Sequence, residues 1–445
     1  MLDREILRLA IPALAAFAGQ PLFLLADAAI VGHLGADALA GLSLASTILQ
    51  TVIGLMIVLS FTATAMVSRH LGAGDQRRAL SAGIDGLWVA AISGVILVGS
   101  GLLVTRWIVG MTGADLAVQD QAVRYLHWSL PGLPGMLAGM AATGILRGLQ
   151  DTRTPLIVTV IGFLANIGLN YALVYGVGMG IAGSALGTSL AEDGMALAYL
   201  AILIPMARRA GASMRPDWAN IRRASRTGGW LLVRTAALRI AMLATVLAAT
   251  SLGTASLAAH QLLMTIFTIL AFALDSLAVA GQALTGKELG AGNLVAVRVI
   301  AARLMQWGVG FGVITGILLA VLAGWIAPLF TGDPAVQEAF RAGAIVLALT
   351  QPLAGFVFVL DGVLIGAGDG KYLAIAGAIT LLVYLPLVWA VRLATEQGDW
   401  GSDPAKGLLW LWAAFSVGYM GARAGTLWAR ARGDAWMQPG ELGVG

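Results

Sequence analysis

Residues 304–330 read LMQWGVGFGVITGILLAVLAGWIAPLF, an apolar run of 27 residues that contains no Asp, Glu, Lys or Arg. A helix rises 1.5 Å per residue, so about 20 mostly apolar residues cross the hydrocarbon core of a bilayer. The run therefore predicts a transmembrane helix. Runs of the same character recur along the whole chain.

Twelve transmembrane spans are predicted in all, which makes the chain an all-α membrane protein. The spans cover residues 6–32, 39–70, 80–109, 117–146, 154–176, 181–206, 227–250, 257–286, 295–327, 336–366, 372–392 and 406–430. Several are longer than one bilayer crossing requires, which indicates tilt or extension beyond the lipid.

The composition excludes several classes of protein. Of the 445 residues, 59% are hydrophobic and 11% are charged, whereas soluble domains carry about 25% charged residues. The chain has no Cys, which excludes a disulfide framework, a thiolate zinc site and a cysteine nucleophile. The sequence also has no Walker motif, and its four His residues have no metal-binding spacing. We therefore predict a transporter rather than an enzyme, with no cofactor and no resident metal.

The loops between the spans alternate in charge. Basic residues gather in one set, most densely in the segment 207–226, whereas the loops at 33–38, 177–182 and 251–256 hold no Lys or Arg. The positive-inside rule places the basic set in the cytoplasm. An even number of spans then puts both termini in the cytoplasm, and we expect an inner (cytoplasmic) membrane location. The net charge of +4 is explained by these loops and does not indicate nucleic-acid binding.

The chain repeats itself. The sequence HLGAGD at 70–75 resembles ELGAGN at 288–293, which lies 218 positions later. The same shift relates two further sets of residues. These are Gly35, Leu39 and Ala40 with Gly253, Leu257 and Ala258, and Gly144, Gly148 and Asp151 with Gly362, Gly366 and Asp369.

Each repeat holds six spans, so both copies have the same orientation in the membrane. We predict two six-helix lobes related by a pseudo-twofold axis along the membrane normal, an arrangement found among transporters. The N-terminal lobe would cover residues 1–206, a cytoplasmic linker 207–226 and the C-terminal lobe 227–445. A duplicated membrane scaffold without transport is the alternative.

Short motifs in both lobes carry a family resemblance. Gln20-Pro21 is followed by Asp27 and by VGHLG at 31–35. The LGAG motif occurs twice, RGLQDT stands at 147–152, and Asn166 is followed by Asn170-Tyr171.

In their order, these motifs resemble the MATE (multidrug and toxic compound extrusion) transporters, in particular the DinF-like branch. The resemblance implies efflux of drugs or organic cations, driven by inward flow of protons or sodium. The implied partners are small organic or cationic substrates and the lipid bilayer. We expect a monomer.

Asp27 is the first candidate for the coupling site. It lies about five residues from the predicted outer end of the 6–32 span, roughly 8 Å deep at 1.5 Å per residue. An ionisable side chain at that depth is costly and indicates function. Asp27 could carry a proton, bind Na⁺ through oxygen, or serve only as a hydrogen-bond acceptor between helices. Pro21, six residues earlier, can bend this helix because it removes a backbone hydrogen bond.

Polar side chains of two other spans lie at a similar depth. Asn166 and Asn170 share one face of the 154–176 span, and Thr188 lies at the corresponding level of the 181–206 span. The resemblance places the family's N-lobe cation site on Asp27, Asn166, Asn170 and Thr188. Many family members carry Asp where this chain has Asn170, and the missing charge favours protons over Na⁺. Ordinary hydrogen bonding between helices is the alternative for the polar residues.

Further ionisable residues lie within the spans. Glu192 follows Thr188 by one helical turn, so it is either a second protonatable group or a structural one. Arg239 and Asp275 are predicted at one depth on adjacent spans, and we expect an ion pair with a structural or a gating role. Asp361 is a possible acid of the C-terminal lobe.

The repeat predicts that the two lobes differ in function. The position 218 residues after Asp27 is Thr245, so the second copy lacks this acid. We therefore expect an antiporter whose cation coupling resides in the N-terminal lobe. One alternative is a lipid-linked precursor flippase of the same superfamily, although the predicted central positions are poor in Arg and Lys. The other is a channel or scaffold without coupling.

Overall fold

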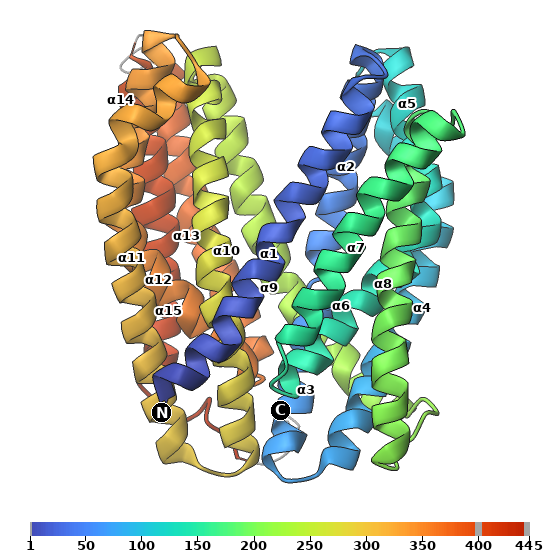
Figure 1. Cartoon of the computed structure of the whole chain (residues 1–445). Helices are drawn as coiled ribbons and strands as arrows, with labels where there is room; N and C mark the ends of the chain where they lie inside the picture. Colours follow the sequence, from blue (N-terminus) through green and yellow to red (C-terminus); the bar gives the residue numbers. More distant parts are fainter. Residues whose placement is uncertain (1, 397–402, 440–445) are drawn as a thin grey trace. The chain divides into compact units, whose positions relative to one another are not determined.

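The computed structural model describes residues 2–396 and 403–439, and these residues form helices and connecting turns without a strand. Figure 1 labels most of the helices. In the first half they are α1 (Leu2–Gly32), α2 (Ala36–Met56), α3 (Val58–Gly72), α4 (Gln76–Gly110), α5 (Leu116–Ser129), η1 (Leu130–Gly132), α6 (Leu133–Gly148), α7 (Arg153–Tyr171), η2 (Ala172–Gly176) and α8 (Ile181–Arg209). In the second half they are α9 (Trp218–Ser251), α10 (Thr254–Gly290), α11 (Leu294–Phe330), α12 (Pro334–Gly366), α13 (Gly370–Glu396), α14 (Pro404–Ala413), η3 (Ala414–Tyr419) and α15 (Met420–Ala431).

The predicted spans correspond to these helices. Eleven helical stretches among the described residues are long and apolar enough to cross a membrane. The twelfth predicted span, 406–430, is built from α14, η3 and α15, because a π-helical turn at Ala414–Tyr419 interrupts it. The chain is therefore a helical membrane protein with multiple spans.

The repeated LGAG motif acts in the same way in both halves. After α3 and α10 the chain turns through Gly74 (φ 78°) and Gly292 (φ 73°), a left-handed conformation that favours glycine. The next residue caps the following helix. The Asp75 side chain accepts from the backbone N–H of Arg78 at 2.8 Å, and Asn293 accepts from that of Ala296 at 3.1 Å.

The repeated glycines of α6 and α12 allow close helix contact. A Cβ atom on Gly144 would lie 2.4 Å from the carbonyl oxygen of Ser60 in α3. A Cβ atom on Gly362 would lie 2.7 Å from the Cα atom of Ala278 in α10. The residues that reveal the repeat are therefore those that shape two equivalent helix pairs.

The structure divides into two compact units. One is Ile11–Gly228, and the other combines residues 2–10 with Gly229–Pro439. This differs from the predicted division, because the first residues of α1 belong with the C-terminal unit. There Asp3 accepts from Arg303 Nε at 2.7 Å and from Trp307 Nε1 at 2.8 Å.

The segment predicted as the linker, 207–226, packs on the N-terminal unit. The backbone N–H of Asp217 donates to Asp85 on α4 at 2.9 Å, and Trp88 Nε1 donates to the carbonyl oxygen of Met214 at 3.3 Å. Helix α9 already begins within this segment, at Trp218.

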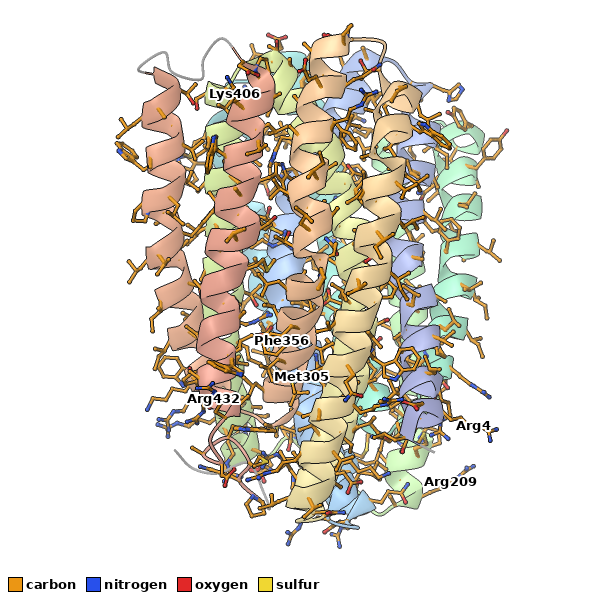
Figure 2. All side chains as sticks on the ribbon, turned by 90° about the vertical axis from the view of Figure 1, so that its left-hand side faces the viewer. Arg4, Arg209, Met305, Phe356, Lys406 and Arg432 are labelled. Atoms are coloured by element: carbon orange, nitrogen blue, oxygen red, sulfur yellow. The ribbon has the colours of Figure 1, made fainter. Side chains whose placement is uncertain are left out.

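In the C-terminal unit, α10, α11 and α12 run alongside one another (Figure 1). Large apolar side chains such as Ile314, Val321 and Trp325 are exposed on α11, as expected for a surface that faces lipid. Figure 2 shows Lys406 near one end of this unit, and Arg4 and Arg432 toward the other. Charged side chains therefore mark its ends.

Candidate functional site

The structure brings four of the predicted site residues together inside the N-terminal unit. Asn170 Nδ2 on α7 donates to Asp27 Oδ1 on α1 at 2.5 Å, and Thr188 Oγ1 on α8 donates to Asp27 Oδ2 at 3.4 Å. Asn166 Nδ2 donates to Thr188 Oγ1 at 2.9 Å. Asp27 is 5% exposed, and both asparagines are fully buried.

The partners of Asp27 are neutral. Among the residues that the structure describes, its carboxylate is bonded to an amide and a hydroxyl group and to no Lys or Arg side chain. A buried carboxylate without a cationic side chain is costly. Such a position can be neutralised by an arriving proton or by a bound cation.

Tyr125 of α5 is a neighbour of this site that the sequence did not single out. Its buried side chain lies beside Thr188 and Ser129 and within electrostatic reach of Asp27. Nothing in the local sequence distinguishes it from the other tyrosines, because its position depends on how α5 packs against α8.

A close approach of α7 and α8 shapes the site. A Cβ atom on Gly187 would lie 2.1 Å from Asn170 Oδ1, and one on Gly183 would lie 2.8 Å from the backbone of Leu173. A π-helical turn, Ala172–Gly176, follows Asn170 closely, and such turns are frequent at functional sites. Only glycine at position 187 leaves room for the amide that holds Asp27.

Pro21 lies inside α1, about 1.7 turns before Asp27. The helix is continuous from Leu2 to Gly32 despite Pro12 and Pro21. Proline has no N–H, so Pro21 cannot donate the usual helical hydrogen bond to the carbonyl oxygen of Phe17, four residues earlier. The side chain of Phe17 contacts Arg147, whose guanidinium carbon lies over the ring, 5.0 Å from the ring centroid. Bending at Pro21 stays a prediction.

Glu192 lies on α8 one turn beyond Thr188, toward the end of the helix that bears Arg208 and Arg209. It is close enough to Asp193 and to Tyr199 for electrostatic interaction. Its role in coupling stays a prediction.

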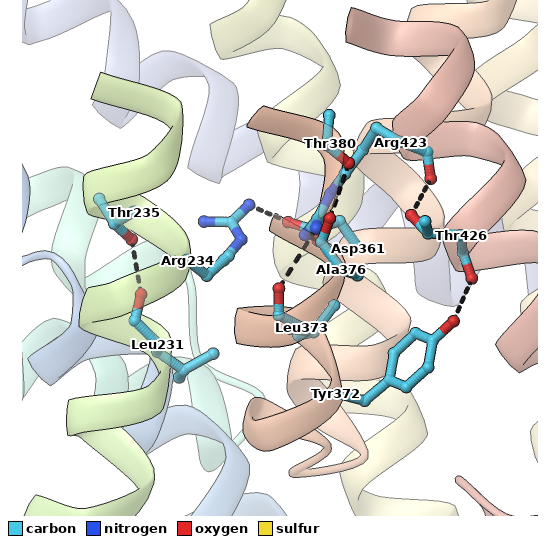
Figure 3. Close-up of polar contacts among 10 residues, drawn as sticks. All are labelled: Leu231, Arg234, Thr235, Asp361, Tyr372, Leu373, Ala376, Thr380, Arg423 and Thr426. Carbon is cyan, nitrogen blue, oxygen red and sulfur yellow. Dashed lines mark hydrogen bonds and ion pairs between the residues drawn. The ribbon is translucent and has the colours of Figure 1, made fainter. Parts of the chain in front are cut away.

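Asp361, the possible acid of the C-terminal lobe, is buried on α12 between two arginines (Figure 3). Arg234 of α9 pairs with Oδ2, and Arg423 of α15 pairs with Oδ1. Arg423 also donates to the carbonyl oxygen of Leu373 at 3.3 Å. Both oxygens of Asp361 are thus occupied by guanidinium groups, which ties α9, α12 and α15 together.

The predicted pair of Arg239 and Asp275 receives no support from this arrangement. Arg239 is exposed, and Asp275 lies within electrostatic reach of Arg234. Arg234, on the same helix as Arg239, forms its ion pair with Asp361. A bond between Arg239 and Asp275 stays a prediction.

The C-terminal unit carries a neutral counterpart of the Asp27 site. Thr245 and Tyr384 lie 218 positions after Asp27 and Asn166, and their hydroxyl oxygens are 2.6 Å apart. The Tyr384 ring packs edge-on against Phe415, with centroids 6.1 Å apart. Where the N-terminal unit has a buried acid, its repeat has two hydroxyls and aromatic packing.

Comparisons with known proteins agree with this architecture. A family model described as MatE matches residues 12–172 and 232–390. The probable multidrug resistance protein NorM of Thermotoga maritima is 32% identical over 193 residues, which covers 42% of each protein. DNA damage-inducible protein F of Escherichia coli is 27% identical over 243 residues, or 54% of this chain and 53% of that protein. The chain thus matches about half the length of each of these curated relatives.

The fold is shared with solved structures. A crystal structure of a MATE protein in the bent conformation has a TM-score of 0.87 at 22% identity, covering 98% of this chain and 96% of that one. The family model matches well over half of the present sequence, in two segments that fall in the two repeats. On these grounds the chain belongs to the MatE family of transporters.

Proposed function

We propose that this chain is a secondary antiporter that exports small organic cations or amphipathic drugs in exchange for protons that bind at Asp27. Na⁺ is the alternative coupling ion. The observation that carries the proposal is the charge balance at Asp27. A buried carboxylate on the first helix is held by neutral groups of α7 and α8, and no cationic side chain of the described residues compensates it.

The same contacts support a mechanism. Protonation removes the negative charge of Asp27 and weakens its bond from Asn170. Helix α1 then bends at Pro21, because proline cannot donate a backbone hydrogen bond within the helix, and repacks against α7 and α8. This rearrangement closes the substrate cavity of the lobe. Coupling requires only that proton and substrate favour different states. A solved MATE structure described as bent is consistent with such a change.

The proposed location is the bacterial inner membrane with both termini in the cytoplasm. The basic loops and the bacterial relatives support this orientation. Under this orientation the Asp27 site lies in the outer half of the membrane.

Efflux of a panel of cationic dyes from proteoliposomes tests the proposal, with the proton and sodium gradients imposed separately. We expect efflux in the wild type to follow the proton gradient and Asp27→Asn to lower it by about tenfold or more. Asp37→Asn, an exposed acid at the start of α2, is the control and should transport normally. Undiminished gradient-driven efflux by Asp27→Asn would overturn the proposal.

A further inference from the structure

One partly buried face of α8 leads away from the Asp27 site within the N-terminal unit. Thr188, Glu192, Met195 and Tyr199 are spaced by four, three and four residues, so they share this face. From Thr188 to Tyr199 the helix rises about 16 Å. The face therefore connects the Asp27 site with the half of the helix that ends at Arg208 and Arg209.

Glu192 is the acid on this face. Among residues 2–396 and 403–439, its carboxylate has no hydrogen bond or ion pair with a protein group, only electrostatic interactions with Asp193 and Tyr199. Asp193 points toward α6 instead. Its Oδ1 atom lies 2.1 Å from the position that a Cβ atom on Gly135 of α6 would take. The two adjacent acids therefore differ in direction, because only Glu192 lies on the helix face that begins at Thr188.

Polar groups continue beyond Glu192. The buried Tyr199 hydroxyl donates to the carbonyl oxygen of Pro155 at 3.4 Å and lies beside the hydroxyls of Thr143 and Thr159. Arg147 of α6 lies within electrostatic reach of Tyr199.

The titratable groups within electrostatic reach of Glu192 are Asp193 and Tyr199 of the same helix. Arg147 of α6 lies within reach of Tyr199, and Asp27 of α1 and Tyr125 of α5 lie at the Thr188 end of the face. Arg147 is held by the Phe17 ring and by a 3.5 Å contact with Ser60 Oγ. Within the described residues, the Glu192 carboxylate has no Lys or Arg side chain as a direct counter-ion.

We propose that Glu192 is the inner proton acceptor for Asp27, which extends the antiport function proposed above and rests on it. The Thr188 hydroxyl, which donates to Asp27 Oδ2 in the structure, turns to accept the proton of the Asp27 carboxylic acid and releases its own hydroxyl proton. Thr188 passes a proton on to the Glu192 carboxylate. Asp27 thereby becomes a carboxylate and Glu192 a carboxylic acid, so the charge of the lobe is unchanged. Glu192 then releases the proton past Tyr199 toward the cytoplasm.

One step needs a bridging water. Four residues along a helix correspond to about 6 Å of rise, which exceeds a direct hydrogen bond between Thr188 and Glu192. A water molecule between the hydroxyl and the carboxylate completes the route. Because the proton leaves Asp27 toward the cytoplasm through Glu192, Asp27 loses its proton while the lobe stays closed to the outside.

Two assays on the same proteoliposomes separate proton transfer from folding. Efflux driven by an imposed proton gradient requires proton release at the inner side. Exchange of labelled for unlabelled dye without a gradient uses only substrate-loaded states of an antiporter. In Glu192→Gln we expect gradient-driven efflux to fall by about tenfold or more, while dye exchange stays within about twofold of wild type. Pyranine fluorescence in the lumen reports the matching loss of proton movement.

Asp193→Asn is the matched control, since it removes the neighbouring acid from the same helix, and it should keep both activities. Glu192→Asp keeps a carboxyl group and should recover most of the gradient-driven efflux that Glu192→Gln loses.

Equal losses in exchange and in efflux, equal losses in the Gln and Asp variants, or normal gradient-driven efflux in Glu192→Gln would overturn the inference. If Asp27→Asn abolishes driven efflux while Glu192→Gln does not, only the inference fails. Normal efflux by Asp27→Asn would instead defeat the antiport proposal.

Discussion

A single residue, Asn170, sets the charge of the Asp27 site. Its amide holds Asp27 Oδ1 and lies 3.4 Å from both Asn166 Oδ1 and Thr188 Oγ1. A carboxylate at this position would place a second negative charge among the same oxygens. Since oxygen ligands and negative charge favour hard cations, the neutral Asn at 170 supports the proposal of a proton as the coupling ion.

Asn170→Asp should therefore make transport respond to sodium. We expect a sodium gradient to stimulate dye efflux by about fivefold or more in this variant, through a coupling of roughly 1 kcal/mol, and to have little effect on the wild type. Asn220→Asp, close to the start of α9, is the charge-matched control. An Asn170→Asp variant that stays insensitive to sodium would mean that the site cannot accept this ion.

At the scale of helices, the contact between α7 and α8 is as important as the polar residues. Gly187→Ala would drive a methyl group into Asn170, since the added Cβ would lie 2.1 Å from its Oδ1. Such overpacking costs about 1–3 kcal/mol, so we expect a lower melting temperature and loss of proton-driven efflux. Gly194→Ala on the same helix meets nothing within 4 Å and should be neutral. Normal coupling in Gly187→Ala would show that the Asn170 contact is dispensable.

The proposed bending of α1 at Pro21 can be tested at the same scale. Pro21→Ala restores an N–H that can bond the carbonyl oxygen of Phe17, which straightens and stiffens the helix. We expect slower turnover, by about tenfold for a penalty near 1.4 kcal/mol, with dye binding unchanged. Pro328→Ala, inside α11 of the other unit, is the control. Unaltered turnover in Pro21→Ala would exclude the bend as a required step.

At the scale of the whole molecule, the two repeats use buried charge for different purposes. Asp361 is enclosed by Arg234 and Arg423, whereas Asp27 has only neutral partners. An acid that is already paired with two guanidinium groups is poorly placed to accept a cation. We therefore expect Asp361 and its two arginines to support the framework of the C-terminal unit, and the proposed coupling to reside at Asp27.

Asp361→Asn should therefore affect stability more than coupling. The substitution leaves two arginines in a buried cluster without their counter-ion, and breaking a buried pair costs about 3–5 kcal/mol. We expect a clearly lower unfolding temperature in detergent, while the protein that remains folded keeps the wild-type dependence of efflux on the proton gradient. A shift of that dependence without loss of stability would assign Asp361 to coupling.

Much of this architecture was predictable because it is encoded locally. The spans follow from apolar runs long enough to cross a bilayer and from the basic loops between them. The repeat follows from glycine motifs that recur 218 positions apart. Each of these signals depends on residues close together in the sequence, so each could be predicted without the structure. The layer of Asp27, Asn166, Asn170 and Thr188 was predictable for a related reason. Depth in a membrane helix follows from counting residues, and the family resemblance selected the same positions.

The partners of Asp361 were decided by tertiary packing alone. Arg234 and Arg423 are separated from it by 127 and 62 positions, and both depth and helix rotation must agree before such groups meet. Counting residues gives depth but not rotation, so the sequence alone did not predict that Arg234 and Arg423 meet at Asp361. The approach of Tyr125 to Thr188 depends on rotation in the same way. The chain thus specifies its helices and its internal symmetry, and the packing of those helices selects which buried charges are neutralised and which remain available to a proton.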